Sequence, residues 1–122
     1  MAHILVVDDD EQFRGMLVQM LGQDGHRLSI AHDGAVGLQM IQDVKPELII
    51  TDILMPHMDG IELIMELSRR SSGIPIIAVS GGRRSVSADF NLESASMMGV
   101  KATLSKPFAR ADLRKAIEQA LA

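Results

Sequence analysis

Two kinds of hydrophobic pattern alternate along the chain. Short aliphatic runs of strand length, rich in β-branched residues, cover residues 4–7, 28–31, 48–51, 74–79 and 100–104. Three of these runs are almost continuously apolar, which is typical of strands that are covered on both faces. The pattern therefore predicts five buried strands.

The segments between these runs have helical spacing instead. In two of them, apolar residues recur at positions i, i+3, i+4, i+7 and i+8, as in a helix with one buried face. The first stripe consists of Phe13, Met16, Leu17, Met20 and Leu21, and the second of Leu113, Ala116, Ile117, Ala120 and Leu121. Shorter stripes are formed by Leu38, Ile41 and Val44, and by Ile61, Ile64 and Leu67.

Strands and helices thus alternate along the chain, with glycine and proline at the joints. This order predicts an α/β fold, a doubly wound parallel sheet with helices on both faces and right-handed crossovers. We expect a single domain over residues 1–122, because this length is ordinary for one domain. The last helical stripe ends with the chain, so no effector domain is expected after it.

Composition and charge narrow the class of protein. With 47% hydrophobic and 23% charged residues, the chain has the composition of a globular domain. It has no cysteine, which excludes disulfide bonds and thiolate metal sites. The net charge of -4 argues against direct nucleic-acid binding. The first apolar run is too short for a signal peptide or a membrane span, so we expect a soluble, cytoplasmic protein.

Polar residues suited to phosphate and metal chemistry follow four of the predicted strands. They are Asp8, Asp9 and Asp10 after the first, Asp52 after the third, Ser80 after the fourth and Lys106 after the fifth. In a doubly wound sheet, ligands bind beyond the carboxyl ends of the strands. We therefore expect these side chains to lie at one edge of the sheet.

The carboxylates of Asp8, Asp9 and Asp52 would repel one another there. Two like charges about 4 Å apart cost about 4 kcal/mol at an effective dielectric constant of about 20. Such a cluster needs a cation or the protonation of one member. Oxygen ligands without histidine or cysteine suit a hard ion such as Mg²⁺. The alternative is that Asp9 or Asp10 only caps the first helix, but a third acid on a neighbouring strand favours the metal site.

Lys106 and Ser80 are candidates because of their position. The lysine ammonium suits a phosphoryl oxygen or a carboxylate, and the serine hydroxyl could donate beside the backbone amide of Gly81. Taken alone, each is more often an ordinary residue, a surface lysine or a turn-forming serine. Their position at strand ends near three acids favours a role in binding a phosphoryl group.

Together these residues resemble the response-regulator receiver family over essentially the whole chain. The matching motifs are Val6-Val7-Asp8-Asp9-Asp10, Thr51-Asp52-Ile53-Leu54-Met55-Pro56-His57-Met58-Asp59-Gly60, Ser80, and Lys106-Pro107-Phe108. Each motif alone is weak evidence, whereas all four in order at the expected strand ends form a specific signal. The resemblance implies a three-layer, flavodoxin-like (βα)5 fold with strand order 2-1-3-4-5.

The resemblance also implies a role for each candidate residue. Asp52 is the phosphoacceptor; Asp8, Asp9, Asp52 and the backbone carbonyl of Leu54 hold Mg²⁺ or Mn²⁺; Ser80, the amide of Gly81 and Lys106 contact the phosphoryl group. The chemistry agrees, because a carboxylate nucleophile splits the transfer into two steps while metal and lysine neutralise the phosphoryl oxygens. The family also has a cis peptide bond before Pro107, and Gly60 would supply a positive φ or close packing.

By the same resemblance, the phosphoryl donor is a phosphohistidine of a histidine kinase or of a phosphotransfer protein. Phosphorylation would change the face built by the fourth helix, the fifth strand and the fifth helix. The domain would assist its own phosphorylation and dephosphorylation, but it would not be a metabolic enzyme. No direct contact with nucleic acid or membrane is expected.

Three features depart from the family pattern. Thr103 stands where the family has an aromatic residue, which argues against output signalling through burial of a ring. The stretch 81–96 is longer than in most members; it is either the moving output element, with Phe90 in place of the ring, or a tolerated surface insertion. Leu54 and Gly82 replace polar side chains that orient the attacking water, so the sequence predicts slow autodephosphorylation.

Other functions fit the sequence less well. A haloacid-dehalogenase-type phosphohydrolase would use Asp8 and Asp10 as its acid pair, but Gln12 does not match its motif and no acidic pair follows Lys106. Flavin binding is disfavoured, because three acids replace the phosphate loop after the first strand. A receiver-like module that acts only by surface contacts remains the main alternative, although it needs no charged cluster.

Overall fold

The computed structural model describes residues 2–53, 58–80 and 99–122. Within these ranges the chain forms five strands and four helices, in alternating order apart from the segment between the last two strands. They are β1 (His3–Val7), α1 (Glu11–Gln23), β2 (Arg27–Ala31), α2 (Gly34–Val44), β3 (Leu48–Asp52), α3 (Gly60–Arg69), β4 (Ile76–Ser80), β5 (Ala102–Ser105) and α5 (Arg110–Leu121). The fourth predicted helix would fall within 81–98, outside the described residues.

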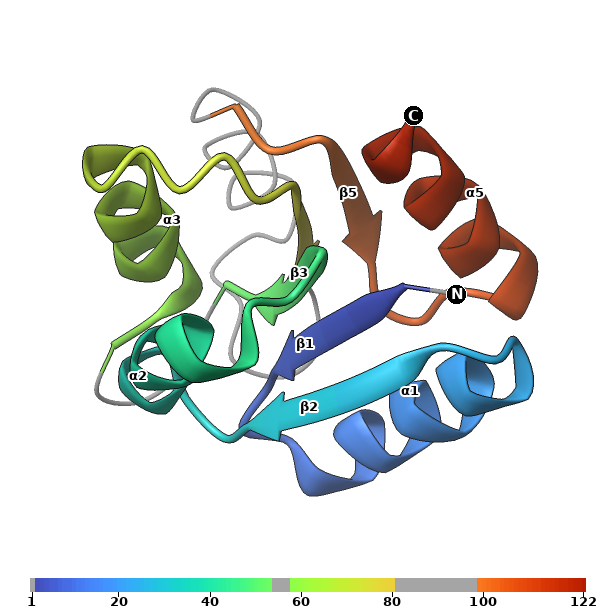
Figure 1. Cartoon of the computed structure of the whole chain (residues 1–122). Helices are drawn as coiled ribbons and strands as arrows, with labels where there is room; N and C mark the ends of the chain where they lie inside the picture. The colour runs from blue at the N-terminus through green and yellow to red at the C-terminus, as the bar shows by residue number, and fades with distance from the viewer. Residues whose placement is uncertain (1, 54–57, 81–98) are drawn as a thin grey trace.

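The strands form one sheet in which every paired neighbour runs parallel (Figure 1). Their order is β2-β1-β3-β4-β5, so the chain winds outward from β1 in both directions. The predicted α/β fold class and the strand order 2-1-3-4-5 are thereby confirmed. The winding changes direction between β1 and β3, which places the carboxyl ends of these two strands at the usual ligand position of such sheets.

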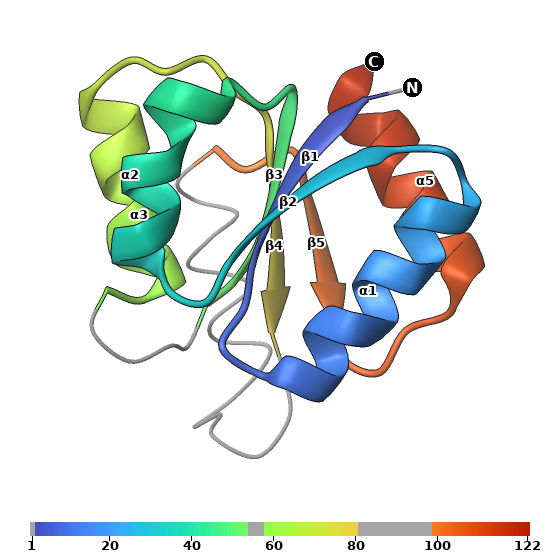
Figure 2. The ribbon, with the colours of Figure 1, turned by 60° about the horizontal axis from the view of Figure 1, so that its bottom comes forward.

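The helices cover the sheet in three layers (Figure 2). Helices α1 and α5 lie on one face, and α2 and α3 lie on the other. Alternation along the strands supplies one core to each face, because successive side chains point to opposite sides. In β1, Ile4 and Val6 belong to the core under α1 and α5, while Leu5 and Val7 belong to the core under α2 and α3.

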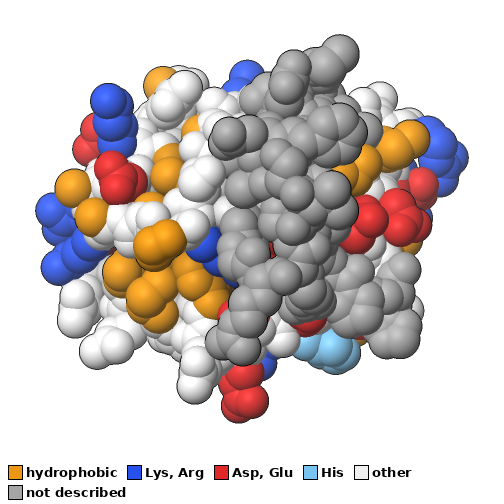
Figure 3. All heavy atoms as spheres, turned by 180° about the vertical axis from the view of Figure 1, so that it is seen from behind, with side chains coloured by type: hydrophobic (Ala, Val, Ile, Leu, Met, Phe, Trp, Pro, Cys, Tyr) orange, Lys and Arg blue, Asp and Glu red, His pale blue; other side chains and the backbone are white. Residues whose placement is uncertain are grey.

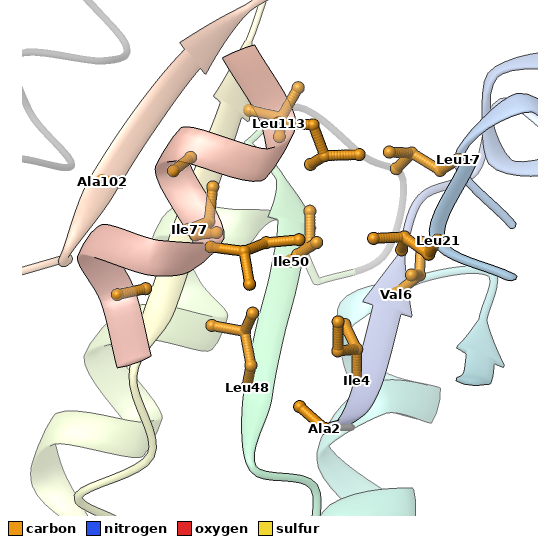
Figure 4. Packing of buried hydrophobic residues seen from close by; sticks show 14 of the residues in the cluster. Ala2, Ile4, Val6, Leu17, Leu21, Leu48, Ile50, Ile77, Ala102 and Leu113 are labelled. Carbon is orange, nitrogen blue, oxygen red and sulfur yellow. The ribbon is translucent and has the colours of Figure 1, made fainter. Parts of the chain in front are cut away.

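The first of these cores joins segments that are distant in sequence (Figure 4). Leu17 and Leu21 of α1 and Leu113 of α5 are at most 1% exposed and pack against the inward side chains of β1, β3 and β4. Burial of apolar area, at about 25 cal/mol per Å², is the main favourable contribution to folding. The helical stripes of the sequence therefore mark the buried faces of α1 and α5, except that Met16 and Leu121 are 37% and 42% exposed and lie outside the core.

Aspartates begin three of the four described helices. The side chain of Asp10 accepts from the amides of Gln12 and Phe13, which starts α1 directly after β1. Asp33 and Asp59 cap α2 and α3 in the same way. These caps satisfy amides that the helix itself leaves unpaired, and they set the point at which each loop at the sheet edge ends.

Two strand boundaries differ from the sequence prediction. β4 begins at Ile76 rather than at residue 74, since Gly73 has a φ of +71° and Pro75 has no amide hydrogen to donate. β5 begins at Ala102 rather than at residue 100, because Gly99 turns the chain with a φ of +87° just before it. The other boundaries lie within one residue of the prediction.

The surface carries charges of both signs. On the side opposite to that of Figure 1, hydrophobic side chains gather in one part, with acidic and basic side chains scattered around them (Figure 3). Among the described helices, none combines the length and the apolar character needed to cross a membrane.

Candidate functional site

The carboxyl ends of four strands bring the predicted residues to one edge of the sheet. β1 and β3 pair in parallel with Val7 opposite Thr51, so the next residues, Asp8 and Asp52, lie side by side. One oxygen each from Asp8, Asp9 and Asp52 lies within 4.8 Å of the others. The acids that were expected to converge therefore do converge.

The turn after β1 gives Asp8 and Asp10 different environments. The carboxylate of Asp8 is buried and accepts from the amide of Asp10 at 2.8 Å. The guanidinium of Arg14 donates to the carbonyl of Asp8 at 2.9 Å, which ties the turn to the first turn of α1. The interpretation as a helix cap is confirmed for Asp10, whereas Asp8 and Asp9 each place one oxygen in the cluster with Asp52.

Lys106 reaches into this cluster from the loop after β5. Its Nζ lies 2.9 Å from Oδ2 of Asp52 and 3.3 Å from Oδ2 of Asp8. The exposed fractions of the three side chains are only 12%, 7% and 2%, in the order Lys106, Asp52 and Asp8. One ammonium thus bridges two carboxylates on neighbouring strands in a place largely closed to water.

Burial sets the protonation behaviour of these groups. Loss of water and, after it, the neighbouring charge of Asp52 raise the pKa of Asp8 to about 6, although the amide of Asp10 and the charge of Lys106 act to lower it. Burial also lowers the pKa of Lys106, but the hydrogen bond and charge of Asp52 outweigh it, so this pKa ends above its ordinary value. The lysine is therefore a permanent cation, and it offsets only part of the negative charge.

Ser80 ends β4 next to the same edge. It is 1% exposed, and its hydroxyl has no hydrogen-bond partner among the residues that the structure describes. A buried hydroxyl without a partner is costly, so such a group usually serves a ligand or a second conformation. The neighbouring Gly81, which was predicted to offer its amide, lies outside the described residues, as does Leu54.

Gly60 is required by close packing and not by a positive φ. A Cβ atom at this position would lie 2.1 Å from the carbonyl oxygen of Asp52. The amide of Gly60 donates to the carbonyl of Ile53 at 2.7 Å, which brings the start of α3 directly against the end of β3. The absence of a side chain at residue 60 is thus what allows the backbone of Asp52 its position.

The loop after β5 has the expected backbone geometry. The peptide bond between Lys106 and Pro107 is cis, as the resemblance implies. Thr103 lies on β5 in a half-buried position. The stretch 81–96, with Phe90, lies outside the described residues.

The contacts of Phe13 with Lys106 and with Phe108 were not anticipated from the sequence, although Phe108 itself belongs to the motif Lys106-Pro107-Phe108. The Nζ of Lys106 lies 3.9 Å from the ring centroid of Phe13, and the ring of Phe108 meets that of Phe13 edge to face at 5.5 Å. The helical stripe identified Phe13 only as a core residue. The contact was invisible because it joins α1 to a loop near the other end of the chain.

The donor set fits a hard divalent cation. Asp8, Asp9 and Asp52 offer oxygen atoms within coordination reach of one point. A divalent ion would leave one of their three negative charges, which the ammonium of Lys106 offsets. The chain has no cysteine, and the cluster contains neither sulfur nor imidazole, which disfavours zinc and copper. The arrangement can hold a cation and present one carboxylate, that of Asp52, between this cation and an ammonium.

Comparison with known protein families gives one match over nearly the whole chain. Residues 4–118 match the family model described as "Response regulator receiver domain". Among curated proteins, the response regulator MprA of Mycobacterium ulcerans is 36% identical over 110 residues, which are 90% of this chain and 46% of MprA. The chain therefore spans less than half the length of this relative.

Solved structures agree with this match. The receiver domain of NtrX from Brucella abortus superposes with a TM-score of 0.88 at 30% identity, covering 97% of each chain. The chemotaxis protein CheY4 of Vibrio cholerae superposes with a TM-score of 0.84 at 28% identity, covering 99% of each chain.

Proposed function

Because the chain belongs to the response regulator receiver domain family, the phosphoacceptor modules of two-component signalling, we propose that Asp52 is the residue that takes the phosphoryl group. The observation that carries this proposal is the position of its carboxylate. Asp52 is buried at the end of the middle strand, with Lys106 Nζ at 2.9 Å and two further acids within 4.8 Å. Of the three clustered acids, it is the one on β3, where the family motif has its phosphoacceptor.

In this proposal Asp8, Asp9 and Asp52 hold Mg²⁺, with Mn²⁺ as a substitute. The carbonyl of Leu54 would complete the protein ligands. When bound, the cation neutralises charge on the oxygens of the phosphoryl group. The raised pKa of Asp8 supports a cation here, since it reports burial and uncompensated repulsion by Asp52.

The transfer itself needs little from the protein beyond placement and charge. A carboxylate oxygen of Asp52 forms a bond to phosphorus while the bond from phosphorus to the donor's imidazole nitrogen breaks. The electron pair of the broken bond stays on that nitrogen. Lys106, already at hydrogen-bond distance from Asp52, turns toward a phosphoryl oxygen, and the product keeps about -1.5 to -2 charges for it to balance.

Ser80 would couple phosphorylation to a change of conformation. Its hydroxyl, buried and without a described partner, would donate to a phosphoryl oxygen together with the amide of Gly81. Such a donation would shift the end of β4 and, through it, the face that includes β5 and α5. The donor is a phosphohistidine of a histidine kinase or of a phosphotransfer protein, and an output protein would read the shifted face.

Intact mass spectrometry tests the proposal. The protein is incubated with Mg²⁺ and acetyl phosphate, and the same reaction is run with Asp52→Asn and without Mg²⁺. The wild type should gain the mass of one phosphoryl group only when Mg²⁺ is present, and the variant should gain none. Equal labelling of both proteins would contradict the role of Asp52, and no labelling of either would favour a module that acts by surface contacts alone.

A further inference from the structure

The aromatic residues of this chain are concentrated around one lysine. The chain contains three phenylalanines, no tyrosine and no tryptophan. Two of the three, Phe13 on α1 and Phe108 after β5, contact each other, and Phe13 also contacts the ammonium of Lys106. Two of the three aromatic side chains of the chain thus lie beside the candidate phosphoryl site.

We infer that Phe13 is a positioning residue, whose ring face holds the Lys106 ammonium at Asp52 and Asp8. The inference rests on the proposed function, because it concerns the lysine that balances the phosphoryl charge. Nζ lies 3.9 Å from the ring centroid, well inside the range of about 6 Å for cation–π attraction. Phe13 is 9% exposed and the Lys106 side chain 12%, so water screens this attraction little.

The ring supplies a contact that the carboxylates cannot. The attraction of Lys106 to Asp8 and Asp52 depends on their charge, which changes when a cation binds and when Asp52 forms its bond to phosphorus. The quadrupole of a phenyl ring is independent of these events. Phe13 therefore keeps the ammonium at the site when the carboxylates bind the cation or when Asp52 is bonded to phosphorus. The ring does not occupy the N–H groups that a phosphoryl oxygen needs.

Phe108 fixes the orientation of this ring. The two rings are 5.5 Å apart at an interplanar angle of 84°, which is a favourable edge-to-face arrangement. Phe108 stands two residues after Lys106 in the same loop, so one loop provides both the ammonium and the ring that orients Phe13. This contact also joins the start of α1 to the start of α5.

The rate of phosphorylation by acetyl phosphate in saturating Mg²⁺ is the first readout. Phe13→Leu should lower this rate by about two- to tenfold, because it removes the ring face and keeps an apolar core residue. Leu17→Ala is the matched control, since Leu17 is a buried residue one turn further along α1 and belongs to the same core. It should reduce the thermal stability at least as much and leave the rate within twofold of the wild type.

A fluorinated series at residue 13 keeps the shape of the ring and separates electrostatics from packing. Replacement of Phe13 by 4-fluoro-, 3,5-difluoro- and pentafluorophenylalanine should lower the rate in steps, at nearly constant thermal stability. In NMR spectra, the ε-methylene protons of Lys106 should show an upfield ring-current shift in the wild type that is lost in Phe13→Leu.

Three outcomes would decide against the inference. A rate unchanged across the fluorinated series overturns it, as does an equal loss of rate in Leu17→Ala and Phe13→Leu. A wild type that gains no phosphoryl group contradicts the proposed function and the inference with it. The first two outcomes leave the role of Asp52 intact, so the two failures are distinguishable.

Discussion

The side chains at the sheet edge differ in how firmly the fold holds them. Asp10 is committed to the cap of α1, and Asp8 is fixed by the amide of Asp10 and by Lys106. The ammonium of Lys106 contacts two carboxylates and a ring. The hydroxyl of Ser80 has no hydrogen-bond partner within the described part of the chain. Preorganised charge and one uncommitted donor are what a phosphoryl switch requires at the level of single residues.

Replacement of Asp8 tests how much the acidic cluster costs. In the absence of divalent cations and near neutral pH, Asp8→Asn should raise the free energy of unfolding by about 1 to 3 kcal/mol, because a buried carboxylate beside Asp52 is removed. Asparagine keeps the acceptor for the amide of Asp10. Urea denaturation measures the change, and Asp43→Asn, on the exposed side of α2, is the matched control. A less stable Asp8→Asn would show that the cluster is not under repulsion.

Asp24 should make stability depend on acid pH. Hydrogen bonds from Arg114 and then Arg110 hold the pKa of Asp24 well below its ordinary value of 3.8. A lowered folded pKa contributes stability that is present above about pH 4 and is lost as the pH falls through the folded pKa. The wild type should therefore be more stable than Asp24→Asn near neutral pH, with the difference shrinking in strong acid. A difference of equal size at all pH values would contradict this assignment.

At the residue scale, the sequence revealed the groups but not all of their partners. Asp8, Asp52 and Lys106 could be predicted together because each lies at, or directly after, the carboxyl end of a strand of a parallel sheet. The ring of Phe13 could not be placed, since its spacing indicates burial and nothing about which cation it faces. Likewise, Asp24 has no motif, and its pairing with α5 depends on how two helices pack on one face.

At the scale of elements, the acidic edge depends on short connections. α1 begins four residues after β1 ends, and the starts of α1 and α3 are set by Asp10 and Asp59. The contact of Gly60 with the carbonyl of Asp52 closes the β3–α3 connection against the sheet. Displacement of any of these helix starts would therefore move a carboxylate of the cluster.

Gly60→Ala tests this dependence. The added methyl group would meet backbone atoms of Asp52 and Ile53 at 2.1 and 2.7 Å, so the start of α3 must shift. We expect a loss of about 1 to 3 kcal/mol in unfolding free energy, as for other overpacked sites, and weaker Mg²⁺ binding. Thermal or urea denaturation measures the loss.

Gly15→Ala provides the opposite control. Gly15 lies in the middle of α1, and a Cβ atom there meets nothing within 4 Å. Alanine should stabilise the protein by about 0.5 to 1 kcal/mol through helix propensity alone. If both glycine variants changed stability alike, close packing at Gly60 would not be the explanation.

The starts of β4 and β5 are set by backbone geometry and not by the hydrophobic pattern of the sequence. Aliphatic character continued through Ile74 and Val100, and both were predicted as strand residues. Gly73 and Gly99, at positive φ, instead turn the chain next to them, and the strands β4 and β5 begin only at Ile76 and Ala102. Hydrophobicity indicates that a segment is buried, whereas hydrogen-bond pairing decides which of its residues form the strand.

At the scale of the whole molecule, the metal and the fold should stabilise each other. A cation that binds only the folded chain adds about 2.7 kcal/mol at a concentration a hundred times its dissociation constant. Mg²⁺ should therefore raise the melting temperature of the wild type, and a chelator should reverse the effect. Asp8→Asn should lose most of this response while Asp43→Asn keeps it; an equal response in both variants would place the cation elsewhere.

The global architecture was the most predictable level. Five strand-like runs separated by helical stripes allow few topologies, because parallel strands need crossovers and these are right-handed. The order β2-β1-β3-β4-β5 itself came from the resemblance, and the structure agrees with it. Whole-fold features follow from repeated patterns, whereas the fine arrangement of Lys106 between two acids and a ring follows from packing.

The most direct test of the central claim is to identify the phosphorylated residue chemically. Borohydride reduces an aspartyl phosphate to homoserine, which peptide mass spectrometry locates within the sequence. After reaction with acetyl phosphate and Mg²⁺, homoserine should appear at residue 52 alone and should be absent when Mg²⁺ is withheld. Homoserine at Asp8 or Asp9 instead of Asp52 would contradict the account.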